Sequence, residues 1–101
     1  MKKPKISSYK KQIDSFCKKY HIVMLALFGS ILTKRFGPTS DVDFLVEFEK
    51  KHVPSLFDIV SIEEELSNII GHKADLRTPN EISKYFVNEV LSKAKVIYGH
   101  F

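Results

Sequence analysis

The centre of the chain holds two apolar segments, IVMLALFGS at residues 22–30 and DVDFLVEF at residues 41–48. The first segment begins with seven apolar residues, too short a run for a helix, and a glycine follows them. We therefore predict a strand that is buried on both faces. In the second segment apolar residues alternate with Asp41, Asp43 and Glu47. This alternation predicts a second strand with one face in the core.

The segments next to these strands indicate short helices. Apolar residues recur at helical spacing over residues 9–20, which predicts a first helix with Ser7 or Ser8 as its N-cap. Residues 31–36 predict one short helix between the two strands, because Gly37-Pro38 is a strong helix breaker.

The second half of the chain repeats this alternation of helix and strand. Ser55 and Asp58 resemble a capping box that opens a helix, which Gly71 ends. The apolar face of this helix comprises Leu56, Ile59, Val60, Leu66, Ile69 and Ile70, and its solvated side comprises Glu63, Glu64 and Glu65. Residues 73–77 alternate as a third strand, and the next segment turns into a helix that ends near residue 94. The stretch at residues 95–98 predicts a last short strand.

This order of elements defines the fold class. Helices and strands alternate along the chain without a repeat, a linker or a shift in composition. We predict an α/β (α+β) fold in which a small mixed sheet is flanked by helices. The length of 101 residues corresponds to a single domain, residues 1–101.

Composition excludes several classes of protein. The single cysteine, Cys17, rules out an internal disulfide framework and a cysteine-based zinc cluster, and it suits a reducing compartment. No apolar run approaches the length of about 20 residues that spans a bilayer, so we expect a cytoplasmic protein without a membrane association. The net charge of +4 permits an anionic ligand. Direct nucleic-acid binding is not favoured, because no basic face interleaved with aromatic residues is evident.

Polar residues of related chemistry gather at the strand ends. Gly29 and Ser30 follow the first strand, where a glycine lets the backbone approach a ligand and free N–H groups of a helical turn bind phosphate oxygens. Asp41 and Asp43 share one strand face, about 7 Å apart, and both can turn toward one Mg²⁺ ion. Asp75 joins them if the third strand is a neighbour. Such a set is suited to metal-assisted nucleotidyl transfer.

A known family carries this same pattern. Phe28-Gly29-Ser30, ten further residues and Asp41-Val42-Asp43 form the signature GS-x10-DxD. In this signature the chain resembles the polymerase-β-like nucleotidyltransferase superfamily, and the surrounding residues are similar to its minimal nucleotidyltransferase (MNT) branch. The resemblance continues at residues 63–66, 73–79 and 89–94, so it covers nearly the whole chain in order.

The resemblance implies a fold and an activity. Members of this branch are stand-alone catalytic cores with a polymerase-β-like nucleotidyltransferase fold, and many are MntA-like antitoxins encoded beside a HEPN-domain ribonuclease toxin. It therefore implies a Mg²⁺-dependent transfer of AMP from ATP to a hydroxyl, most simply a tyrosine of such a toxin. A hetero-oligomer with the HEPN partner is expected as well.

The resemblance also assigns residues by position. Gly29 and Ser30 are expected to hold the nucleotide phosphates, and Asp41 and Asp43 to bind two Mg²⁺ ions. Asp75 is expected to be the third carboxylate, which completes the metal site or acts as the base for the acceptor hydroxyl.

The chain departs from the family pattern directly after Ser30. Many relatives have an arginine and a glycine there, whereas this chain has ILTKR at residues 31–35. Lys34 or Arg35 is expected to supply the positive charge from a shifted position. We place Lys34 and Ser40 in the nucleotide site together with the glycine and serine.

Other functions stay open on the sequence. The chain could neutralise its partner by complex formation without catalysis, or it could modify a small-molecule acceptor. Cys17 lies on the apolar face of the first helix and is expected in the core. Two further sets carry no distinct signal: the scattered histidines, expected in surface or loop positions (His21, His52, His72 and His100), and the aromatic residues, expected mostly in the core (Phe57, Tyr85, Phe86 and Tyr98).

Overall fold

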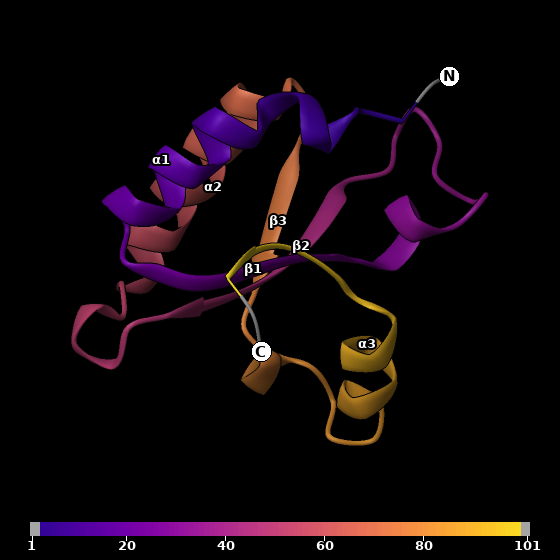
Figure 1. Ribbon diagram of the computed structural model, residues 1–101. Coiled ribbons are helices and arrows are strands. Elements are labelled where there is room, and N and C mark those ends of the chain that lie inside the picture. Colours follow the sequence, from indigo (N-terminus) through magenta and orange to yellow (C-terminus); the bar gives the residue numbers. More distant parts are fainter. Residues whose placement is uncertain (1–2, 100–101) are drawn as a thin grey trace.

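A four-stranded mixed sheet forms the centre of the computed structural model, which describes residues 3–99 (Figure 1). The strand order is β3-β2-β1-β4. β1 (Ile22–Phe28) pairs in antiparallel fashion with β2 (Val42–Phe48) and with β4 (Lys95–Gly99). β2 pairs in parallel fashion with β3 (Ala74–Arg77). All four predicted strands are therefore present.

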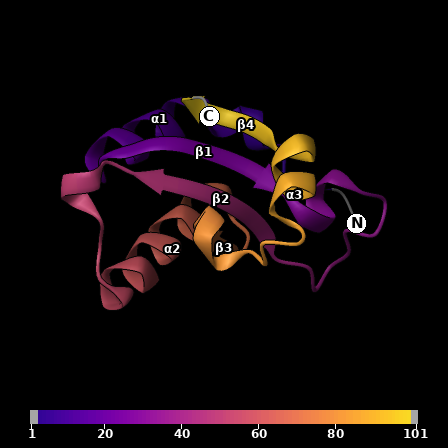
Figure 2. The same ribbon diagram turned by 90° about the horizontal axis from the view of Figure 1, so that it is seen from below.

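Helices lie on both faces of this sheet, as expected for the predicted class. α1 (Lys10–Lys19) and α2 (Leu56–Ile70) lie side by side over one face, and α3 (Val87–Lys93) lies on the other (Figures 1 and 2). None of the helices within residues 3–99 combines the length and the apolarity needed to cross a bilayer.

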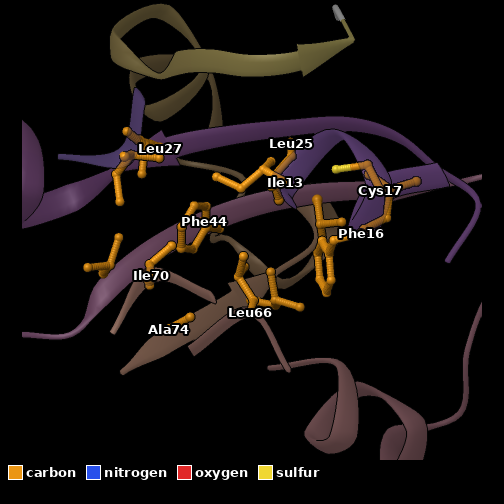
Figure 3. Packing of buried hydrophobic residues seen from close by; sticks show 14 of the residues in the cluster. Ile13, Phe16, Cys17, Leu25, Leu27, Phe44, Leu66, Ile70 and Ala74 are labelled. Carbon is orange, nitrogen blue, oxygen red and sulfur yellow. The ribbon is translucent and has the colours of Figure 1, made fainter. Parts of the chain in front are cut away.

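The larger part of the core lies beneath α1 and α2 (Figure 3). Val42, Phe44 and Val46 alternate along β2 and pack against this layer. The opposite face carries a smaller cluster, in which Leu45 packs with Met24 beneath α3. Both faces of β2 are therefore buried at its centre, whereas the alternation in the sequence predicted only one. Cys17 is fully buried in the larger cluster, as expected, and burial together with the nearby Asp14 carboxylate raises the pKa of its thiol to about 12.

Three predictions about the helices differ from the structure. Ser7 and Ser8 do not cap α1, because they lie in a 3-10 turn and Tyr9 is the N-cap, without a side-chain bond. Residues 31–36 are not a helix. A 3-10 turn at Gly29–Leu32 takes its place and stops where Thr33 becomes extended. The last predicted helix ends near residue 94 as expected, since α3 stops at Lys93, but it begins only at Val87 because the chain is extended at Ile82.

The ends of α2 agree with the sequence, but its exposed face does not. Ser55 and Asp58 form the predicted capping box, and Gly71 ends the helix with a φ of +67°. Leu56 and Val60 were expected in the core, yet they are 85% and 56% exposed. The apolar periodicity of the sequence identifies the apolar face of the helix. It does not show which part of that face other elements cover, and here the first turns of α2 stay uncovered.

Three of the four aromatic residues that were expected mostly in the core are exposed. Phe57, Tyr85 and Phe86 are exposed rather than core residues, whereas Tyr98 packs against the larger cluster. His100 lies outside the described residues.

Candidate active site

The predicted carboxylates lie at the end of the sheet where β1 ends and where β2 and β3 begin, although the oxygens of all three are not within 4.8 Å of one another. Asp43 pairs in the sheet with Phe28 of β1 on one side and with Asp75 of β3 on the other. Phe44 and Leu76, the next residues, pack in the core beneath α1 and α2. Since side chains alternate along a strand, Asp43 and Asp75 point toward the opposite face, which is the face of α3. The condition under which Asp75 joins the other two carboxylates, that its strand neighbours the strand of Asp43, is therefore met.

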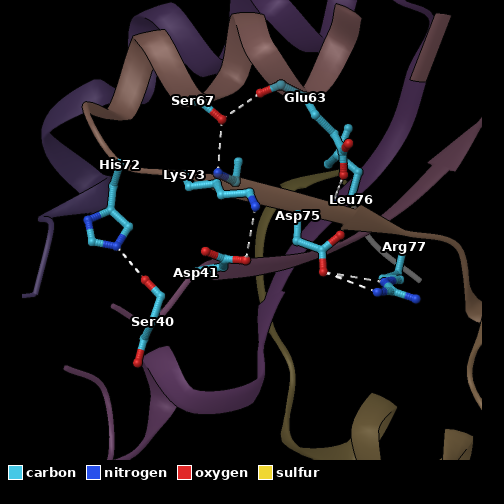
Figure 4. Close-up of polar contacts among 10 residues, drawn as sticks. Ser40, Asp41, Glu63, Ser67, His72, Lys73, Asp75, Leu76 and Arg77 are labelled. Atoms are coloured by element: carbon cyan, nitrogen blue, oxygen red, sulfur yellow. Dashed lines mark hydrogen bonds and ion pairs between the residues drawn. The ribbon is translucent and has the colours of Figure 1, made fainter. Parts of the chain in front are cut away.

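Asp41 lies directly before β2 at the same edge of the sheet (Figure 4). Its carboxylate lies 3.8 Å from the ammonium group of Lys73, which directly precedes β3. The backbone N–H of Val42 donates to the carbonyl of Lys73 at 2.9 Å. This bond holds the starts of the two strands together, so the acidic residues of both strands are kept at one end of the sheet.

Gly29 is held against this carboxylate group. Its φ is +77°, a conformation that side chains with a Cβ rarely adopt. A Cβ added at this position would collide with the carboxylate oxygen Oδ2 of Asp43. The glycine therefore leaves space beside the carboxylate and exposes the backbone next to it, as a phosphate-binding turn requires.

Burial and neighbouring negative charge together raise the pKa of Asp43. Partial burial is the main cause that raises the pKa of its carboxyl group, and the nearby carboxylates of Asp75 and Asp41 raise it further. The Arg77 guanidinium has the opposite, weaker effect. A divalent cation bound among these oxygens would relieve the repulsion.

Arg77, which we had not selected from the sequence, is the direct partner of Asp75. Its Nε and Nη2 atoms lie 3.4 Å and 3.3 Å from Oδ2 of that carboxylate (Figure 4). The two residues are two positions apart on β3 and share one face, so the alternation of this strand was a signal for the pair.

Two side chains of α2 bind the outer edge of β3 on either side of Asp75 (Figure 4). Ser67 Oγ accepts the backbone N–H of Ala74 at 2.9 Å, and Glu63 Oε2 accepts that of Leu76 at 2.7 Å. Ser67 Oγ also donates to the carbonyl of Glu63 at 2.7 Å. We refer to Glu63 and Ser67 as the edge clamp. Burial is the largest of the causes that raise the pKa of Glu63.

The edge clamp corrects one expectation about α2. Glu63, Glu64 and Glu65 were all expected on a solvated side, but of the three only Glu64 is exposed, and the other two are partly buried. Glu65 accepts hydrogen bonds from Lys19 at 2.9 Å and from the Tyr20 hydroxyl at 2.7 Å.

An open hollow of about 680 Å³ lies between the turn after β1 and α3. None of the three carboxylates lines it, but its wall includes Gly29, which lies against Asp43. Such a volume suits a nucleoside-sized ligand. Apolar, polar and charged residues line the hollow. They are Phe28, Gly29, Ser30, Leu32, Thr33, Arg35, Glu89, Val90 and Lys93.

The structure separates the two remaining nucleotide-site candidates from this hollow. Lys34 is exposed and is not a wall residue, whereas Arg35 is. The hydroxyl of Ser40 accepts the backbone N–H of Gly37 at 3.0 Å, and its carbonyl lies 2.6 Å from Nε2 of His72. Ser40 thus stabilises the loop that leads into the acidic segment.

The donor set fits magnesium. Asp41, Asp43 and Asp75 supply only carboxylate oxygens, which Mg²⁺ prefers together with water and phosphate. The pKa of Asp43 is raised chiefly by burial and then by the carboxylates of Asp75 and Asp41, and a divalent cation would offset the repulsion among these groups.

Comparison with known sequences gives this geometry a context. The family model described as polymerase beta, nucleotidyltransferase matches residues 11–100. A Methanocaldococcus jannaschii protein assigned as a protein adenylyltransferase is 33% identical over 75 residues, which are 74% of this chain and 75% of that protein. The protein adenylyltransferase MntA of Thermococcus cleftensis is 28% identical over 93 residues, which are 92% of this chain and 87% of that protein.

Solved structures share the fold at low sequence identity. A toxin–antitoxin structure with AMP-PNP matches with a TM-score of 0.71 and 17% identity, over 90% of this chain and 73% of that chain. The complex of tri-AMPylated Shewanella oneidensis HEPN toxin with MNT antitoxin matches with a TM-score of 0.67 and 17% identity, over 93% and 72%. The family match, the sequence relatives and the carboxylate site agree. The chain therefore belongs to the polymerase-β-like nucleotidyltransferase family, in its minimal form, and is a nucleotidyltransferase.

Proposed function

We propose that this enzyme transfers AMP from ATP to a tyrosine hydroxyl of a HEPN-domain ribonuclease toxin and thereby acts as its antitoxin. The observation that carries the proposal is the convergence of Asp43 and Asp75, with Asp41 close by, beside the exposed backbone of Gly29. Two further findings support it. The sequence relatives are assigned as protein adenylyltransferases, and the same fold occurs in an antitoxin bound to an AMPylated HEPN toxin.

The proposed reaction is a displacement at the α-phosphorus of ATP. The acceptor oxygen forms a new bond to this phosphorus, the bond to the bridging oxygen breaks, and pyrophosphate leaves. The proton of the acceptor hydroxyl passes to a base, for which Asp75 is our candidate. Gly29 and Ser30 are proposed to bind phosphate oxygens, with Arg35 supplying positive charge from the wall of the hollow.

The carboxylates would hold the metal ions of this reaction. Asp41, Asp43 and Asp75 are the proposed ligands of two Mg²⁺ ions, which when bound neutralise phosphate charge and make the acceptor hydroxyl more acidic. Arg77 is proposed to hold Asp75 in place before metal and nucleotide arrive, because it already pairs with that carboxylate. We place the reaction in the cytoplasm, where ATP is available.

The test is the intact mass of the protein encoded next to this one, for which the proposal expects a HEPN domain. It is incubated with ATP, Mg²⁺ and either the wild type or the Asp41→Asn/Asp43→Asn variant. Wild type should add whole AMP units to the partner, and the variant should add none. The matched control is Asp14→Asn, since Asp14 lies on α1 and pairs only with Lys10 at 3.3 Å among the described residues.

Other outcomes select other functions. A stable complex with no mass gain in any sample would contradict the modification and leave neutralisation by binding alone. Transfer of AMP to a small hydroxyl compound, without a protein acceptor, would keep the chemistry and exclude the HEPN substrate.

A further inference from the structure

Three metal-binding side chains meet at the other end of the β1–β2 pair, away from the carboxylates. His21 directly precedes β1, Glu49 directly follows β2, and His52 ends the 3-10 turn at Lys50–His52. The sheet register separates these side chains from the active site, because Ile22 pairs with Phe48 at this end of the two strands and Phe28 pairs with Asp43 at the other. The catalytic carboxylates lie at the opposite end of the same strands.

The ligand atoms are already close to the spacing of a metal site. Nδ1 of His21 and Nε2 of His52 lie 3.5 Å and 3.7 Å from Oε2 of Glu49. All three ligand atoms lie within 4.8 Å of one another. A tetrahedral zinc ion with bonds of about 2.0–2.2 Å places neighbouring ligand atoms roughly 3.3 Å apart. Two of the three separations are therefore near this value without any movement of the backbone.

Backbone hydrogen bonds hold the three residues together. The N–H of Glu49 donates to the carbonyl of His21 at 2.9 Å, and the N–H of His52 donates to the carbonyl of Glu49 at 2.8 Å. The two imidazole rings stack with their centroids 3.6 Å apart and their planes 9° from parallel. Because the ring planes are nearly parallel, the two nitrogen lone pairs do not point at one ion in this arrangement, and binding a shared ion requires the rings to rotate about their Cβ–Cγ bonds out of the stack.

The surroundings leave the Glu49 carboxylate free for a cation. Within residues 3–99 its ion-pair partners are the two histidines. The nearby Lys19 is engaged by Glu65 at 2.9 Å instead. The three side chains are about half exposed, at 46%, 51% and 45%, and both histidines border an open hollow of about 380 Å³. Water can therefore reach a fourth coordination position.

We propose that His21, Glu49 and His52 bind a zinc-class divalent cation, which links the start of β1 to the segment that leads into α2. The chemistry of the ligands distinguishes this site from the first one. Imidazole nitrogen favours zinc, nickel and copper, whereas the carboxylates at the other end favour magnesium. The proposal does not depend on the reaction or on its acceptor.

The experiment is metal titration of the full chain after removal of metal with a chelator. We expect one Zn²⁺ per chain, a rise in the melting temperature, and visible absorption of tetrahedral Co²⁺. His21→Asn and His52→Asn should each weaken Zn²⁺ binding by at least about tenfold. Asparagine is chosen at position 21 because His21 has a φ of +57°, which asparagine tolerates.

Matched variants separate the two metal sites. Glu47→Gln changes an exposed carboxylate on β2 outside the cluster and should leave Zn²⁺ affinity unchanged. Asp43→Asn should also leave it unchanged, and excess Mg²⁺ should not compete. The proposal is overturned if Zn²⁺ does not bind, if binding survives all of the His21, His52 and Glu49→Gln substitutions, or if it disappears in Asp43→Asn. Circular dichroism of each metal-free variant shows whether it is folded.

Discussion

Asp43 is a proposed metal ligand, and its ionised carboxylate also lowers the stability of the folded protein. Its pKa is raised in the folded protein, chiefly by burial and then by the carboxylates of Asp75 and Asp41. A carboxyl group with a raised folded-state pKa contributes stability below its unfolded pKa of about 3.9, and that contribution is lost as pH rises through the folded-state pKa. The metal-free protein should therefore lose this contribution on passing from acidic to neutral pH.

The substitution Asp43→Asn tests both properties. In a chelator at pH 7 the variant should unfold at higher denaturant concentration than the wild type, because it removes the ionised group. This advantage should vanish below about pH 4, where the carboxyl group of the wild type is protonated in both states. AMP transfer should fall by about 100-fold or more, since a metal ligand is lost. Equal stability at neutral pH would contradict the stated cause of the pKa shift.

Gly29 is the second residue whose identity the site requires. In Gly29→Ala the left-handed φ of +77° should cost about 1–2 kcal/mol, and the new Cβ would displace the Asp43 carboxylate. Transfer should fall by about 100-fold, because misplacement of a reacting group by about 1 Å has such an effect. The control is Gly37→Ala, where a Cβ meets only the carbonyl of Arg35 at 3.9 Å. Similar activity of the two variants would show that the carboxylate adapts.

At the scale of elements, the edge clamp attaches α2 to β3. Edge strands otherwise expose unpaired backbone groups, and here the N–H groups on both sides of Asp75 are bonded by Ser67 and Glu63. The clamp thus fixes the strand that carries the third carboxylate. β2, α2 and β3 form a parallel unit in which the connecting helix also positions the site residue.

Removal of the clamp should weaken both the fold and the metal site. Ser67→Ala should lower the unfolding free energy by about 1–3 kcal/mol, because it removes the bond to the Ala74 N–H. Glu63→Ala should also raise the Mg²⁺ concentration needed for half-maximal transfer, while Glu63→Gln, which keeps an acceptor, should restore most of the loss. Glu64→Ala, on the exposed side of the same helix, is the control. An unchanged Mg²⁺ requirement in Glu63→Ala would assign the clamp to stability alone.

At the scale of the whole molecule, the core is distributed unevenly. Phe44 is fully buried, whereas Phe57 is 88% exposed. Phe44→Ala should lower the unfolding free energy by about 3–5 kcal/mol. Phe57→Ser should change it by no more than about 0.5 kcal/mol. Urea denaturation of both variants measures the difference, and a large loss in Phe57→Ser would mean that this ring is buried in solution.

Much of the fold and half of the site could be predicted from local patterns. β1 and β2 follow from apolar runs and alternation, and α2 begins and ends at its capping box and glycine. The spacing from Gly29-Ser30 to Asp43 sufficed to place these residues together, because the two strands are consecutive in the chain and pair directly. Helix ends were harder to predict, since short 3-10 turns carry little periodicity.

The strands, α1, α2 and the acidic segment could be read from local patterns, because each depends on residues near one another in the chain, and the family followed from the order of such motifs along the chain. Three contacts became known from the folded chain: Asp75 lies beside Asp43, Glu63 binds the edge of β3, and His21 lies close to Glu49 and His52. These contacts depend on strand order and on the packing of α2 across the sheet. Such long-range pairings leave no periodic signal in the segments that they join, so they become visible only when the chain is folded.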